Sequence, residues 1–147
     1  MKQFHFRLER LLEIKRYYER EAEIQLAKKT GEIISLQNNI ENRQQQLSTM
    51  SIFDKSGGPV SIDRMAVGSM YQYRLHKEIE KFKKEIEEKE KERVELQTEY
   101  IEASKQRKVF EKLKEKREKE YYKKQLKEEH KLIDEIGTHA SAQKLQQ

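Results

Sequence analysis

The feature that most constrains this chain is the spacing of its apolar residues, which recur in alternating steps of four and three. Such steps place a narrow apolar seam along a helix and are typical of coiled coils. In the second half of the sequence they hold without a break. The seam predicted there comprises Leu75, Ile79, Phe82, Ile86, Lys89, Arg93, Leu96, Tyr100, Ala103, Arg107 and Phe110.

The first half of the chain has a similar seam with one predicted irregularity. From Tyr18 through Ala22 to Leu26 the steps are four and four, which predicts a local unwinding of the supercoil. The complete predicted seam is Phe4, Leu8, Leu11, Lys15, Tyr18, Ala22, Leu26, Lys29, Ile33, Leu36, Ile40, Arg43 and Leu47.

Strong helix breakers occur in one segment, Asp54–Pro59, which combines Gly-Gly with Pro. This segment predicts a turn at about residues 51–60. A first helix is expected at about residues 4–50 and a second at about 61–136, followed by a frayed tail over 137–147. A short connection between two helices favours an antiparallel arrangement.

Local chemistry and composition support these boundaries. Ser61 suits a helix N-cap and Gly137 a helix stop. Charged residues make up 40% of the chain and hydrophobic residues 34%, which suits a narrow seam better than a compact core. The predicted fold class is therefore all-α, a long antiparallel two-helix coiled coil (α-hairpin) that forms one domain over residues 1–147.

A turn centred near residue 55 predicts that position i faces about position 110 − i. The second helix would then extend by roughly 30 residues beyond the first, as an overhang from Val109 to Ile136. Residues 105–127 hold eleven Lys/Arg against four Glu, and residues 1–20 hold six against three. Folding is thus expected to bring two positive stretches together. The overhang has apolar residues without a predicted partner, namely Leu113, Tyr121, Tyr122, Leu126, Leu132, Ile133 and Ile136.

Catalytic and metal-binding patterns find no support in the sequence. The chain has no Cys, and its four His residues form no HExxH or other spaced ligand set. Gly57-Gly58 lacks the surroundings of a phosphate-binding loop. We therefore expect a protein that is not an enzyme and has no cofactor and no metal. No stretch approaches the ~20 apolar residues of a membrane span, and the opening residues lack a signal-peptide pattern, so a cytoplasmic location is predicted.

Several binding functions remain open at this point. The overhang suits a docking helix for a partner protein, whereas a third packing element or self-association would use the same apolar residues. The positive stretch over 105–127 keeps a basic nucleic-acid-binding rod as an alternative, although Glu is interleaved and no recognised motif is present. A structural coiled-coil spacer is the other alternative. Lipid insertion is not expected, because the overhang has no broad apolar face.

Two stretches resemble a known family. Phe4–Lys15, read as FHFRLERLLEIK, resembles the opening of the bacterial flagellar export protein FliJ family, roughly F-x-F-R-L-E-x-L-L-x-[IL]-K. Glu129–Glu135 resembles a family pattern close to E-x-K-x-[LIM]-D-E. The resemblance extends over nearly the whole chain in length, hairpin organisation and Lys/Glu content.

The resemblance implies a non-enzymatic component of the flagellar type III export apparatus, similar to the paired terminal helices of a rotary ATPase gamma subunit. The implied partners are the hexameric flagellar export ATPase, the large membrane protein of the export gate and export chaperones, with no nucleic acid. The implied location is cytoplasmic, at the periphery of the inner-membrane export apparatus. The resemblance places Phe4, Phe6, Arg7, Leu8, Leu11, Phe110, Tyr121 and Tyr122 at the ATPase, and Tyr71, Tyr73 and Leu75 near the gate. Simple seam packing is the alternative for Phe4, Leu8, Leu11 and Leu75.

Overall fold

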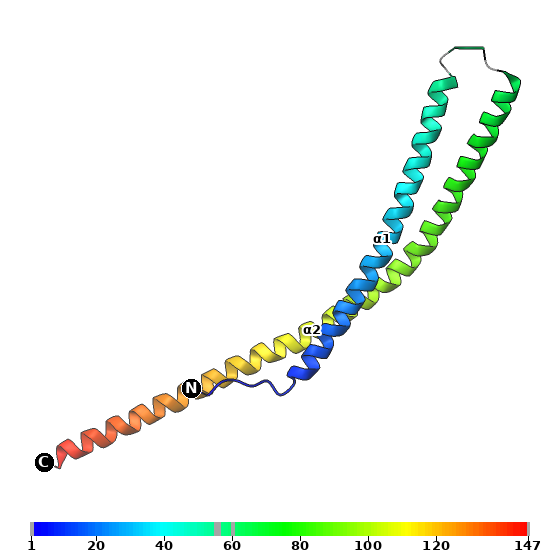
Figure 1. The fold of residues 1–147 in the computed structure, drawn as a ribbon. Coiled ribbons are helices and arrows are strands. Elements are labelled where there is room, and N and C mark those ends of the chain that lie inside the picture. Colours follow the sequence, from blue (N-terminus) through cyan, green and yellow to red (C-terminus); the bar gives the residue numbers. More distant parts are fainter. Residues whose placement is uncertain (1, 55–56, 60, 147) are drawn as a thin grey trace. The chain divides into compact units, whose positions relative to one another are not determined.

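The computed structural model describes residues 2–54, 57–59 and 61–146, without the side chains of 51–54. Two helices, α1 (Glu9–Asp54) and α2 (Ile62–Leu145), pack against each other (Figure 1). The prediction of an all-α helical hairpin is confirmed. The chain divides into a terminal unit, residues 1–19 and 102–147, and a turn-side unit, residues 20–101, and both helices contribute to both units.

The turn-side unit holds α1 and α2 together through apolar residues and cross-helix ion pairs. Its buried side chains are Ile33, Leu75 and Ile79. Arg43 pairs with Glu78, Lys89 with Glu32 and Lys29 with Glu92, at N–O distances of 2.7, 2.8 and 2.6 Å. In each pair the residue numbers add to 121, so the predicted register of 110 − i is wrong. A sum of 121 centres the helical pair near residue 60, whereas the prediction centred it near residue 55.

The terminal unit is built differently, because its first residues are not helical. Residues 2–6 are extended and α1 begins only at Glu9, so the predicted helix start at Phe4 is wrong. The Glu9 amide donates to the Phe6 carbonyl at 3.2 Å and closes a turn before the helix. Phe6 and Leu12 are the buried side chains of this unit. The extended segment thus supplies half of the unit's buried core.

The seam of α1 is regular where an irregularity was predicted. Leu12 is fully buried whereas Leu11 is 43% exposed, and Glu19 is half-buried whereas Tyr18 is exposed. The residues that face α2 are Leu8, Leu12, Lys15, Glu19, Ala22 and Leu26, in unbroken steps of four and three. The predicted unwinding at Tyr18 is therefore wrong. The predicted seam of α2, by contrast, is buried or half-buried at every position.

The turn is described only in part, since Lys55, Ser56 and Val60 of the predicted turn lie outside the described residues. Gly57 has a φ of 73°, in the left-handed region that glycine adopts without strain. Ser61 caps α2 as predicted, because its hydroxyl accepts a hydrogen bond from the Arg64 amide at 3.3 Å. Gly137 does not stop α2, which continues to Leu145.

Candidate protein-docking site

An aromatic cluster joins the N-terminal segment to α2 within the terminal unit. The Phe4 ring lies 5.6 Å from the Tyr121 ring and 6.5 Å from the Phe6 ring, between centroids. Tyr121 and Tyr122 meet edge to face at 5.6 Å. The Tyr121 hydroxyl donates a hydrogen bond to the Lys2 carbonyl at 3.2 Å. These contacts place residues 2–6 along α2, where the helix would otherwise lack a cover.

The overhang of α2 was predicted to begin at Val109, but it begins only after residue 125. Leu113 and Tyr121 are half-buried, because α1 reaches Lys114 and the N-terminal segment reaches residues 121–125. Beyond that point α2 continues for a further 20 residues that are all exposed among those described. Leu126, Leu132, Ile133 and Ile136 remain exposed apolar side chains on this extension, as predicted for the overhang.

A shallow hollow lies beside the aromatic cluster. It has a volume of about 450 Å³ and is lined by Phe4, His5, Phe6, Arg7, Leu8 and Arg117. Arg7 and Arg117 are exposed, and no carboxylate among the described residues forms an ion pair with either of them. The hollow therefore combines aromatic walls with two exposed guanidinium groups, a chemistry that favours an acidic partner surface.

The outer face of α1 adds an apolar patch that the sequence reasoning missed in part. Leu11, Ile14, Tyr17 and Tyr18 are all exposed, and the rings of the two tyrosines lie 6.0 Å apart. Arg10 and Glu13 border the same hollowed surface. Leu11 and Tyr18 were assigned to the seam, which hid this patch. Their spacing from Ile14, three and four residues, is the signal that would have revealed an exposed stripe.

Next to this patch, charged residues form ion pairs across the seam of the terminal unit. Arg107 pairs with Glu19 through its Nε and with Glu111 at 2.5 Å, and Arg16 reaches Glu111 at 3.4 Å. The hydrogen bond to Glu19, then that to Glu111, raises the pKa of Arg107. For Glu111, burial raises the pKa, but hydrogen bonds from Arg107 and Arg16 outweigh it, so the pKa lies below its usual range. The group is thus a charged clamp between the helices.

The structure brings together most of the residues that the resemblance assigned to the ATPase. Phe4, Phe6, Arg7 and Leu8 line the hollow, and the Tyr121 ring lies against that of Phe4. The remaining members lie in the same terminal unit, where Leu11 and Tyr122 are exposed and Phe110 is half-buried. Simple seam packing describes Leu8 better than Leu11.

The residues assigned to the export gate lie in the turn-side unit and do not form one surface. Tyr71 and Tyr73 are exposed, and the ammonium group of Lys77 lies 5.5 Å from the Tyr73 ring centre. Leu75 is buried in the seam, so it is not available to a partner in this conformation.

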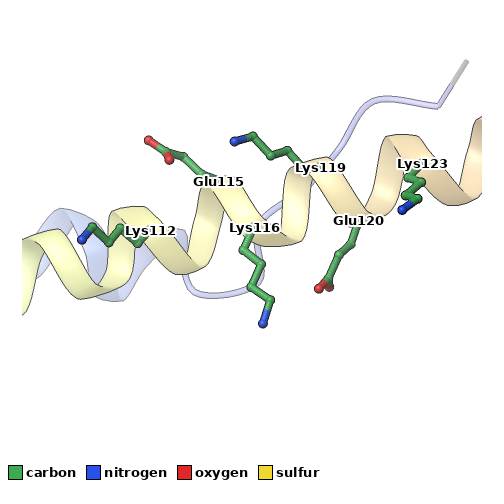
Figure 2. A pocket seen from close by; sticks show the side chains of 6 residues that line it. All are labelled: Lys112, Glu115, Lys116, Lys119, Glu120 and Lys123. Atoms are coloured by element: carbon green, nitrogen blue, oxygen red, sulfur yellow. The ribbon is translucent and has the colours of Figure 1, made fainter.

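A row of lysines follows the solvent-facing side of α2 in the terminal unit. Figure 2 shows four of them, Lys112, Lys116, Lys119 and Lys123, whose side chains fan out from the helix with those of Glu115 and Glu120. The surface between these side chains is open and has no enclosed cavity. We call the full set the lysine row, which comprises Lys105, Lys108, Lys112, Lys116, Lys119, Lys123 and Lys127.

The described part of the chain lacks two other kinds of functional feature. No group of three or more His, Cys, Asp or Glu side chains could hold a metal ion among residues 2–54, 57–59 and 61–146. Within the same residues neither helix is long and apolar enough to cross a membrane. The features that stand out are instead the surfaces of the terminal unit.

Comparison with known proteins agrees with the motifs at the two ends of the chain. A family model described as the flagellar FliJ protein matches residues 4–146. Searches of curated proteins and of solved structures returned no match. The family match includes the extended segment at Phe4, α1, and α2 almost to its end. The chain belongs to the flagellar FliJ family, whose members are non-catalytic components of the flagellar protein export apparatus.

Proposed function

We propose that the chain docks through its terminal unit in the hexameric export ATPase, promotes its assembly and activity, and links it to the export gate and to export chaperones. The observation that carries this proposal is the hollow beside Phe4, where aromatic walls adjoin Arg7 and Arg117, neither of which pairs with a carboxylate of the described residues. Aromatic and arginine side chains together are typical of the energetically dominant part of protein interfaces. Family membership supports the choice of partner.

The exposed patch on α1 supplies apolar area for the same interface. Leu11, Ile14 and Tyr18 follow one face of the helix, as expected for a helix that enters a groove of a partner. A single chain cannot make the same contacts with six identical subunits. Binding therefore favours some subunit states over others, and this differential affinity is what coupling between the ATPase and a second partner requires.

The second contact would use the turn-side unit. Tyr71 and Tyr73 are exposed aromatic side chains there, which suits a weaker contact with the gate protein. Leu75 is not proposed to touch the gate directly, because it is buried against α1. Its proposed role is to hold the segment that carries the two tyrosines.

The test is ATP hydrolysis by the cognate export ATPase with and without this protein. We expect the wild-type chain to raise the rate and to shift the ATPase towards hexamers. Arg7→Gln with Arg117→Gln should weaken both effects about tenfold or more, since each loses a charge-assisted contact. The matched control is Arg20→Gln with Arg64→Gln, which removes the same charge from exposed positions elsewhere.

No change in rate or oligomeric state at stoichiometric excess and low salt would overturn the proposal. A helical chain that also fails to retain the ATPase in a pull-down would instead fit a structural spacer. Equal loss in both double variants would show that overall charge matters and that the hollow does not.

A further inference from the structure

The lysine row lies on one face of α2 along its whole length. Its members recur after eleven residues, from Lys105 to Lys116 to Lys127, with the others between them. At 3.6 residues per turn, all seven lie within an arc of about 100°. From Lys105 to Lys127 the row rises 22 residue steps, or about 33 Å of helix. Over 22 residues a heptad repeat drifts by about 63° around a straight helix, whereas the eleven-residue repeat drifts by about 40° and keeps the row on one face.

The row lies on the face of α2 opposite the seam. All seven lysines are exposed, and in the described part of the chain no carboxylate lies within 4.0 Å of their ammonium groups. Lys114, on the seam side of the same helix, pairs with Glu9 at 2.9 Å. Lysines of α2 that face α1 are thus neutralised within the fold, whereas those of the row leave their charge to another molecule.

We propose that the lysine row binds the surface of an anionic lipid bilayer by electrostatic adsorption, independently of the aromatic cluster. A row on one face of a helix brings all its ammonium groups to a plane at once. A bilayer of anionic headgroups is such a plane, and each lysine near it contributes favourably within a Debye length. Duplex nucleic acid presents a curved backbone, which such a row follows over a shorter distance.

The residues beside the row define the depth of this contact. Val109 and Leu126 lie within or at the edge of the arc and are exposed, so they can reach the headgroup level. Glu115 and Glu120 flank the row and oppose deeper burial (Figure 2). The contact is therefore adsorption without insertion, in which lysine stems extend towards the headgroups.

The experiment is co-sedimentation of the full chain with vesicles of phosphatidylcholine containing about one-third phosphatidylglycerol. We expect binding at about 0.1 M salt, loss of binding at about 1 M salt, and no binding to pure phosphatidylcholine. The variant with Lys112, Lys116, Lys119 and Lys123 all changed to Gln should partition about 100-fold more weakly. Gln is a good helix former, so circular dichroism should show an unchanged helix content.

The matched control changes Lys28, Lys81, Lys83 and Lys84 to Gln, four exposed lysines of the turn-side unit, and should keep partitioning within about threefold. Equal loss in both variants would overturn the proposal in favour of a net-charge effect. Binding to neutral vesicles would overturn it in favour of apolar insertion. Tighter binding to duplex DNA than to the anionic vesicles, at equal salt, would overturn it in favour of a nucleic-acid surface.

Discussion

The terminal unit and the turn-side unit use the same two helices in different ways. In the turn-side unit, α1 and α2 face each other through Ile33, Leu75 and Ile79, and three cross-helix ion pairs keep one register. In the terminal unit α1 has just begun, and an extended segment supplies Phe6 and the ring of Phe4 instead. One unit is a regular helical pair throughout, whereas in the other the pair of α1 and α2 gives way to a short extended segment beside α2.

The difference explains why candidate binding surfaces collect in the terminal unit. In the turn-side unit the seam residues of the two helices satisfy one another through buried apolar side chains and cross-helix ion pairs, whereas Ile62, Val67 and Met70 near the start of α2 are exposed. Where α2 has only an extended segment beside it, aromatic rings and arginines stay at the surface, and beyond residue 125 the helix has no cover among the described residues. Exposed apolar and charged side chains of this kind are available for binding to a partner protein or to a bilayer.

The largest effect on the free energy of unfolding is expected for a substitution in the core of the terminal unit. Leu12→Ala removes a fully buried side chain and should lower the free energy of unfolding by about 2–4 kcal/mol. Leu11→Ala, one residue earlier, should cost less than about 1 kcal/mol, because that side chain is 43% exposed. Urea unfolding followed by circular dichroism measures both. A larger cost at Leu11 would restore the seam predicted from the sequence and contradict this structure.

The next effect compares the ion pairs of the two units. The side chains of Glu19 and Arg107 are 14% and 22% exposed, so a double-mutant cycle with Gln at both positions should give a coupling energy of about 1 kcal/mol. Glu92 is far more exposed, so the cycle for Lys29 and Glu92 should give less coupling and a stronger dependence on salt. Equal couplings would mean that the clamp at Arg107 is no more specific than a surface pair.

Acid should weaken the turn-side unit more than the terminal unit. Hydrogen bonds from Lys89 and Lys29 lower the pKa of Glu32, and one from Lys29 lowers that of Glu92. A carboxyl whose pKa is lowered by folding stabilises the fold above its ordinary value of 4.5, and this stability is lost as pH falls below that value. In the terminal unit the pKa of Glu111 is lowered as well.

Thermal melting between pH 7 and pH 3 tests this prediction. Replacing both Glu32 and Glu92 by Gln should reduce the acid-induced drop in melting temperature more than Glu111→Gln does. An unchanged drop in the double variant would show that other carboxylates govern acid unfolding.

The smallest expected effect concerns the extended segment. Tyr121→Phe removes the hydrogen bond to the Lys2 carbonyl but keeps the ring against Phe4, and should cost about 0.5 kcal/mol. Tyr121→Ala also removes the ring and should expose the segment. Hydrogen exchange of the amides near Phe4 should therefore accelerate slightly in the first variant and strongly in the second. Equal acceleration in both would assign the docking of the segment to the hydroxyl.

The candidate site was predictable where its residues form a local motif and not where they depend on pairing. The motif from Phe4 to Lys15 identified the cluster residues, but their helical placement was wrong because Phe4 and Phe6 pack from an extended chain. The outer patch at Ile14 and Tyr17 was missed because Glu19 occupies the seam. A polar residue in a seam is recognisable only once its partner, Arg107, is known.

By itself, the sequence determined the helical hairpin, the seam of α2 and the cap at Ser61, since periodicity and capping depend on neighbours within a few residues. Only the tertiary structure decided the register, the position of Leu12 in the core and the extended start of the chain. These features depend on pairs far apart in sequence, such as Glu19 with Arg107 and Phe4 with Tyr121. The four-three pattern fits several registers almost equally well, and such long-range pairs select one of them.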